Sequence, residues 1–84
     1  MRTVFDKNGV YDPLVGKCIC LTDIHGKAYI GKVLCRCRAD ENDSGEDSIG
    51  LSFTSRKHWD ADFDRSEILS IEILDDNEIP ERLK

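Results

Sequence analysis

The chain lacks any long apolar run, and its longest uninterrupted hydrophobic stretch is the four residues 18–21. A helix that crosses a bilayer needs ~20 consecutive apolar residues, so no membrane-spanning helix is expected. Residues 1–6 also lack the apolar stretch of a secretory signal peptide. We therefore expect a cytoplasmic protein with no membrane partner.

The sequence has few of the residues and spacings that mark catalytic sites. It contains no Gly-x-Ser-x-Gly elbow, and neither of its two histidines, His25 and His58, lies in a motif with a nucleophile. The six glycines are spread singly, so none forms a glycine-rich loop for phosphate groups. A chain of 84 residues also has little core around which to build a deep cleft. We predict a non-enzymatic protein without a cofactor.

The charge is acidic overall, with a formal net value of -5, and it is unevenly distributed along the chain. Residues 1–38 carry seven basic and three acidic side chains, a balance of +4, whereas residues 39–84 carry five and fourteen, a balance of -9. In one small domain, residues 1–84, the two halves are expected to neutralise each other across the surface. An acidic chain disfavours nonspecific nucleic-acid binding, which depends on Lys and Arg.

Alternation of apolar and polar residues dominates from residue 17 onward and predicts an all-β domain. Strands are expected at residues 17–22, 28–38, 48–54 and 67–74, with a turn at 23–27 in which Gly26 can adopt a positive φ. In the last of these strands the alternation places Leu69, Ile71 and Ile73 towards the core.

The remaining segments are predicted to lie outside the main sheet. The core is expected to cover about residues 14–74, the acidic stretch 39–47 reads as a solvated loop, and residues 75–84 read as a loose tail. Near the N-terminus, Asn8 and Gly9 have the chemistry of a tight hairpin turn, which favours a small strand or hairpin there. The alternative is a lead-in segment that covers an open end of the sheet.

The glycines and alternating runs at 14–21, 25–33 and 66–72 resemble an SH3-like small β-barrel of the Sm-like type. The resemblance covers roughly residues 14–74 and implies a strongly bent antiparallel barrel of four to five strands. Sm-like relatives often form rings and bind RNA, but the Asp, hydrophobic, Asn motif of the family is not met at residues 36–42. The later Arg-Gly pair is also missing near residues 68–70, so the resemblance supplies a shape and leaves the function open.

The four cysteines form two Cys-x-Cys motifs, Cys18 with Cys20 and Cys35 with Cys37. Alternate residues of a strand share a face, so neighbouring strands could bring four thiolates together around zinc. Regular strands hold such side chains apart, however, and free cysteine is a good small core residue. We favour structural thiols and predict no metal site; zinc and disulfides remain alternatives.

A second metal-like pattern, Asp60, Asp62 and Asp64, mimics the opening of a calcium loop. Such a loop needs glycine at its sixth position and a bidentate glutamate at its twelfth. Here those positions hold Arg65 and Ile71, so we interpret the stretch as a solvated acidic segment.

The connection at residues 55–66 holds the best candidate contact residues, Arg56, His58, Trp59 and Phe63. Tryptophan and arginine anchor protein interfaces more often than other residues. Trp59 and Phe63 could line a ligand groove together with Tyr11 and Tyr29. The competing interpretation is that Trp59 and Phe63 fill the end of a small barrel whose core cannot spare them.

We predict a protein-interaction or assembly module that contacts a protein partner through a loop surface or an exposed strand edge. Homo-oligomers are left open. One alternative is RNA binding through the basic second strand, with phosphate contacts from Lys27, Lys32, Arg36 and Arg38. A further alternative is an acidic inhibitor that mimics nucleic acid, with residues 40–47 and 60–64 facing a basic enzyme.

Overall fold

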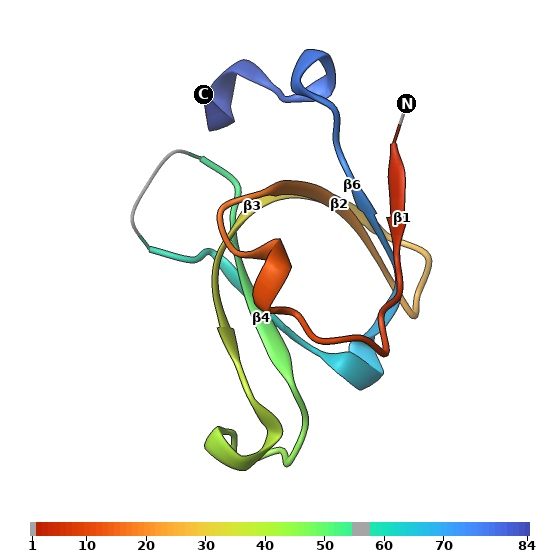
Figure 1. Ribbon diagram of the computed structural model, residues 1–84, viewed down its shortest axis with the longest axis vertical. Coiled ribbons are helices and arrows are strands. Elements are labelled where there is room, and N and C mark those ends of the chain that lie inside the picture. Colours follow the sequence, from red (N-terminus) through yellow and green to blue (C-terminus); the bar gives the residue numbers. More distant parts are fainter. Residues whose placement is uncertain (1, 55–57) are drawn as a thin grey trace.

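The computed structural model describes residues 2–54 and 58–84 and consists of one antiparallel sheet with short 3-10 turns. The strands are β1 (Thr3–Phe5), β2 (Cys18–Asp23), β3 (Ala28–Cys37), β4 (Ser48–Ser52), β5 (Ala61–Asp64) and β6 (Ile68–Ile73). The 3-10 turns are η1 (Asp12–Leu14), η2 (Ala39–Glu41), η3 (Arg65–Glu67), η4 (Asp76–Glu78) and η5 (Glu81–Leu83). The sheet is strongly curled, and η1 lies across its concave side (Figure 1).

The all-β prediction is confirmed, but the predicted barrel of four to five strands is wrong in two respects. The sheet has six strands in the order β1-β6-β2-β3-β4-β5, and within residues 2–54 and 58–84 its edges β1 and β5 do not pair to close it. The four expected strands correspond to β2, β3, β4 and β6. β5 lies in the segment expected to be a polar connection, and β1 pairs with β6 instead of forming a hairpin with residues 10–11.

Two shifts in strand register change which side chains face the core. In β3, Val33 pairs with Leu51 and Cys35 with Gly50, so Leu34 is an extra residue. In β6, Ser70 pairs with Thr22 and Ile68 with Asp23, so Leu69 is the extra residue. An extra residue interrupts the alternation of a strand. The prediction that Leu69 faces the core is therefore wrong: it is 57% exposed, while Ile68 and Ile71 are fully buried.

The glycines of β3 and the β2–β3 turn have separate structural reasons. Gly26 adopts a φ of +83°, as the turn prediction requires. Gly31 lies where the backbone of β4 comes close, because a Cβ there would approach the carbonyl oxygen of Ser52 to 2.8 Å. Glycine is thus needed at position 31 for close packing of two strands, and the bulge in β3 occurs at Leu34.

The main core fills the concave side of the sheet. Its buried members come from every strand except β1 and from the lead-in segment, residues 6–17, which joins β1 to β2: Tyr11, Leu14, Ile19, Leu21, Val33, Ile49, Leu51, Phe63, Ile68 and Ile71. Phe5 of β1 packs against this cluster from the side. Tyr11 and Leu14 therefore cover the open end of the sheet, so the N-terminal region holds both the small strand that the sequence favours, β1, and the covering segment of the alternative.

A second, smaller core lies on the opposite face of β2 and is covered by the C-terminal tail. Cys18 and Cys20 pack there with Leu74 and Leu83, and Leu83 is only 5% exposed. Arg82 fixes the tail further by donating hydrogen bonds to the backbone oxygens of Phe53 and Ile30, at 2.9 and 3.1 Å. The tail differs from the loose segment expected for residues 75–84, because its few apolar residues find a hydrophobic face on the sheet.

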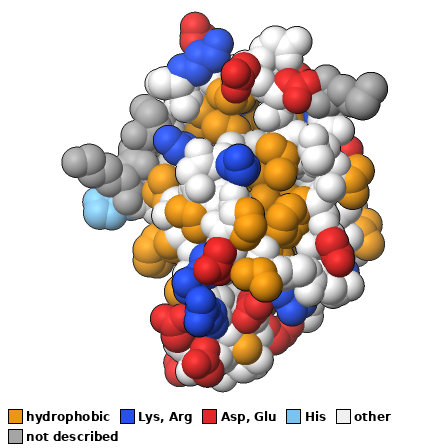
Figure 2. Space-filling view, in the orientation of Figure 1, with side chains coloured by type: hydrophobic (Ala, Val, Ile, Leu, Met, Phe, Trp, Pro, Cys, Tyr) orange, Lys and Arg blue, Asp and Glu red, His pale blue; other side chains and the backbone are white. Residues whose placement is uncertain are grey.

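Charged side chains from distant parts of the chain pair with one another. Arg2 contacts Glu78 at 3.0 Å and Glu72 at 3.4 Å, which joins the basic start of the chain to its acidic end. Acidic and basic side chains are also mixed at the lower end of the face in Figure 2, while hydrophobic side chains gather near its centre. These pairs support the expected neutralisation between the two halves of the chain.

The acidic segment 39–47 is anchored at both ends. The backbone N–H of Ala39 donates to Asp47 at 2.7 Å, and the Asn42 side chain donates to the carbonyl of Glu46 at 2.7 Å and to the Ser48 hydroxyl at 2.9 Å. The prediction that this segment is a loop outside the strands agrees with the structure, although η2 and these hydrogen bonds give it a defined shape.

Candidate functional site

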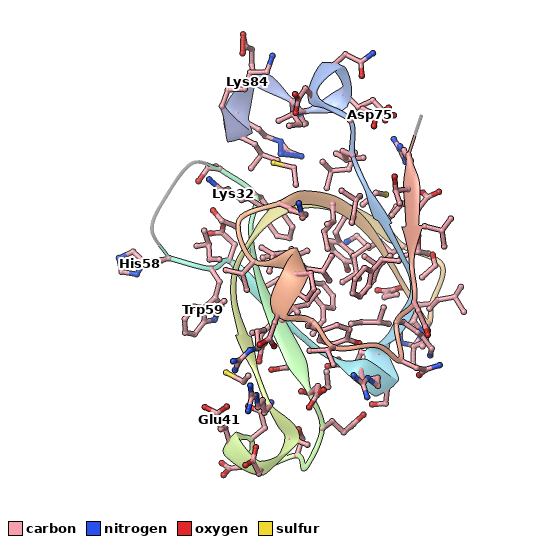
Figure 3. The ribbon with its side chains drawn as sticks, in the orientation of Figure 1. Lys32, Glu41, His58, Trp59, Asp75 and Lys84 are labelled. Atoms are coloured by element: carbon pink, nitrogen blue, oxygen red, sulfur yellow. The ribbon has the colours of Figure 1, made fainter. Side chains whose placement is uncertain are left out.

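The predicted contact residues occupy different environments. Trp59 is 57% exposed and His58 is also exposed, and both project from the outside of the sheet (Figure 3). Phe63 is 8% exposed and belongs to the main core. Arg56 lies outside the described residues. The structure therefore brings His58 and Trp59 to the surface and separates them from Phe63.

The Cβ and Cγ atoms of Trp59 pack against Gly50 of β4. A Cβ at Gly50 would lie 3.1 Å from both Cβ and Cγ of Trp59 and 2.9 Å from Sγ of Cys35. These distances are shorter than most Cβ contacts, so a larger residue at position 50 would require Trp59 and Cys35 to shift, and glycine leaves room for both. Trp59 is thus seated on Gly50 at its Cβ and Cγ, while the residue as a whole remains 57% exposed.

Strand register places an acidic residue beside this seat. Gly50 pairs directly with Asp62 of β5, and directly paired residues present their side chains on the same face of a sheet. On the opposite edge of β4, Gly50 pairs directly with Cys35 of β3. The exposed residues His58, Trp59 and Asp62, together with the half-buried Cys35, form what we call the Trp59 surface.

More carboxylates lie beside the Trp59 surface, along β5. Asp64 shares its face with Asp62, since alternate residues of a strand point the same way. Burial raises the pKa of the Asp64 carboxyl, and the neighbouring carboxylates of Glu67 and Glu46 raise it further. Ser66 donates hydrogen bonds to Glu46 from its backbone at 2.8 Å and from its hydroxyl at 2.9 Å. The outer side of β5 is therefore strongly acidic.

The aromatic groove considered for Tyr11, Tyr29, Trp59 and Phe63 does not form. Tyr29 and Phe63 are in contact, with ring centroids 5.0 Å apart, but they pack at the main core. Tyr11 is buried and faces Phe5, with centroids 6.4 Å apart. Of the two residues considered as a plug for the sheet, Phe63 is buried in that way and Trp59 is not.

The basic residues proposed for RNA contacts do not share one face. Lys32 pairs with Cys18, which belongs to the second core, whereas Arg36 pairs with Ile49 of the main core, so the bulge at Leu34 places the two cations on opposite faces. In a regular strand, the even spacing of Lys32 and Arg36 would have placed both side chains on one face.

Two of these cations are also held by carboxylates. Arg36 contacts Asp12 at 2.7 Å and Glu41 at 3.4 Å, and Arg38 reaches Asp12 at 3.7 Å. Lys27 lies over the ring of Tyr29, 5.2 Å from its centroid. Ion pairing of this kind lowers the positive potential that a phosphate backbone would meet.

The two Cys-x-Cys motifs lie apart. Cys18 and Cys20 pair across the sheet with Lys32 and Ile30, while Cys35 and Cys37 pair with Gly50 and Ser48. All four are free thiols, and the described part of the chain holds no group of three or more potential ligands arranged to bind a metal ion. Burial raises the pKa of both Cys18 and Cys35.

A surface cavity of about 430 Å³ lies on the other side of β3, between the lead-in segment and the residues after the strand. Val10, Asp12, Arg36, Cys37 and Arg38 contribute to its lining. Arg36 and Asp12 of this lining form an ion pair with each other, so these two charged groups already have partners.

Comparisons of the chain with protein-family models, with curated proteins and with solved structures found no match. Among the described residues, no helix has the length and apolar content needed to cross a membrane.

The sequence pattern singles out Trp59 but not the residues that surround it in the structure. Gly50 carried a usable signal, because a glycine inside an alternating strand often marks a close approach of another group. Asp62 carried none, since its place next to Gly50 depends on the register of a strand that the sequence did not reveal.

Proposed function

We propose that this protein is a non-enzymatic interaction module that binds a protein partner through the Trp59 surface. The observation that carries the proposal is the exposure of the only tryptophan in the chain, 57%, on a seat shaped by Gly50. A large aromatic side chain with only two rotatable bonds offers contact area at a low entropic cost. Its preference for interface hot spots makes Trp59 the expected anchor.

The rest of the surface fits an interface better than a catalytic site. His58 and Asp62 are exposed, and Trp59 lies on the convex side of the sheet instead of in a cleft. Arg56 and Phe63 are the other two contact residues expected from the sequence. Phe63 lies in the main core, beneath the strand that carries Asp62. The proposal includes a cytoplasmic location.

We also propose that the sheet is an opened variant of the SH3-like small barrel, of the Sm-like type. Support comes from the strands β2 to β5, which follow one another in the sheet, and from β6, which returns to pair with β2. RNA binding is not favoured, because Arg36 and Arg38 are paired with Asp12 and Arg36 lies on the opposite face of the sheet from Lys32.

Selection from a displayed library of random peptides tests the proposed function. The intact protein, Trp59→Ala and Leu69→Ala are immobilised in parallel. Leu69 is a matched control, because it is an apolar residue with the same exposed fraction, 57%, on a different strand. We expect a peptide family that is enriched on the intact protein and on Leu69→Ala and is lost on Trp59→Ala.

A peptide family that is enriched equally on Trp59→Ala would refute the Trp59 surface as the binding site. Absence of any enriched family, together with tight and steeply salt-dependent binding of an RNA oligonucleotide, would favour the nucleic-acid alternative. Circular dichroism of the variants ensures that each has the fold of the intact protein.

A further inference from the structure

β5 is an edge strand with an open side. Within residues 2–54 and 58–84 it pairs with β4 alone. The backbone N–H of Arg65 donates to the carbonyl of Asp47 at 2.9 Å, towards β4, whereas the N–H of Asp64 donates to Oε1 of Glu67 at 3.0 Å. Successive backbone groups of a strand point in opposite directions. The N–H and C=O of Asp62 therefore face away from β4, towards the open edge.

The side chains along this edge are acidic or aromatic, and both kinds attract a positively charged ligand. Asp62 and Asp64 share the outer face of β5, Glu67 caps its end, and Trp59 lies next to Asp62 on the same face. Carboxylates attract lysine and arginine, and the face of a tryptophan ring adds a cation–π contact. A strand that adds to a sheet edge gains backbone hydrogen bonds, while its alternate side chains give specificity.

We propose that the open edge of β5 takes up an extended segment of the partner that carries lysine or arginine at alternate positions. The cationic side chains lie on the outer face against Asp62, Asp64 and Trp59, and the backbone of the segment pairs with Asp62. The inference rests on the proposed function, since it names the chemistry of the partner at the same surface.

A second copy of the chain is a poorer occupant of this edge. Two β5 strands would bring carboxylates against carboxylates, and the other open edge, β1, has three residues. Arg2, the cation next to β1, is already paired with Glu72 and Glu78.

Trp59 fluorescence provides a direct assay, because the chain contains one tryptophan. The probes are an alternating lysine–threonine octapeptide and its glutamate–threonine counterpart, titrated into the full chain up to ~1 mM, the range of weak single-site binding. We expect a saturable change with the lysine peptide alone. Equal binding of both peptides, or no saturable binding of either, would overturn the inference.

Two backbone-methylated versions of the lysine peptide test strand pairing. One carries N-methyl groups on the lysine amides and the other on the threonine amides. Since only one of these sets can face β5, one peptide should lose about tenfold in affinity and the other should bind nearly as the parent does. Equal affinities for the two methylated peptides would contradict pairing along the edge.

Charge variants locate the site. Asp62→Asn should weaken the lysine peptide about two- to fivefold, the usual range for one exposed ion pair. Asp76→Asn removes the same charge from η4, away from β5, and should leave the affinity unchanged. Equal weakening by the two variants would reduce the effect to net charge and overturn the site.

Failure of the cationic-segment inference can be distinguished from failure of the proposed function. Trp59-dependent library peptides without cationic residues would preserve the interaction module and refute the cationic segment. A dimer of the chain alone that dissociates when Asp62 is changed would assign the edge to a second copy and overturn the inference.

Discussion

Replacement of Arg65 by alanine should strongly destabilise the fold, because this side chain joins three separate parts of the chain. It donates hydrogen bonds to the carbonyl of Gly9 at 2.6 Å and to the Asp47 carboxylate at 2.9 Å. Its guanidinium also lies 5.0 Å from the centroid of the Tyr11 ring. The lead-in segment, the acidic segment and the β5–β6 connection therefore meet at one residue.

The magnitude follows from these three contacts. Arg65 and Asp47 side chains are 30% and 28% exposed, so their ion pair is partly shielded from water and contributes about 1 kcal/mol. The hydrogen bond to Gly9 contributes about 1 kcal/mol, and the cation–π contact ~0.5–1 kcal/mol. Because these contacts are coupled, we expect Arg65→Ala to lower the free energy of unfolding by about 2–3 kcal/mol.

Urea denaturation followed by circular dichroism measures this loss. With a slope near 1 kcal/mol per molar for so small a domain, the midpoint should fall by about 2–3 M. The control is Arg38→Ala, whose side chain is 61% exposed and makes one long ion pair at 3.7 Å, so its loss should stay below about 0.5 kcal/mol. An Arg65→Ala variant no less stable than Arg38→Ala would refute the reasoning.

Three further predictions address the core, the tail and the acidic strand. Gly31→Ala should destabilise by about 1–3 kcal/mol in the same assay, because its Cβ would approach the carbonyl of Ser52 to 2.8 Å; unchanged stability would contradict the close approach. Leu83→Ala should lower Tm through a loss of about 2–3 kcal/mol, unlike a residue in a loose tail. Asp64→Asn should raise Tm at pH 7 and have little effect near pH 3. The pKa of the Asp64 carboxyl is raised by burial and by Glu67, so its charged form opposes folding above its unfolded pKa. This cost disappears as the pH falls and the carboxyl becomes protonated. A lower Tm for Asp64→Asn at pH 7 would contradict that sign.

The regular strands could be predicted from the sequence because their buried residues recur with a period of two. In β4, Ile49 and Leu51 alternate with small residues, and both are fully buried as the pattern indicates. β5 escaped detection because only Phe63 among its residues is buried on the core side, and a single buried residue defines no period.

The bulges could not be predicted, and they decide which charges lie together. The extra residue at Leu34 follows from the pairing of β3 with β4, so it depends on residues distant in the sequence. Its effect is to turn Arg36 towards Asp12 on the concave side, away from Lys32. A candidate RNA surface that looks continuous in the sequence is thereby divided.

The tail shows the opposite error, in which local composition understates the tertiary contacts. Residues 75–84 are mostly charged and predict little burial, yet Leu83 reaches Cys18 and Cys20 on β2. Cys18 and Cys20 are buried on this face of β2, and the segment that covers them has too few apolar residues for its burial to be predicted from the sequence.

Trp59 connects the stability of the fold with its proposed use. A small core was expected to need the tryptophan, but Tyr11, Leu14 and Phe63 complete it from the lead-in segment and β5. The absence of a side chain at Gly50 then gives Trp59 a seat on the convex face, and the same strand pairing places Asp62 beside it. One register therefore creates both the aromatic anchor and the acidic edge, which is why we assign them to a single binding surface.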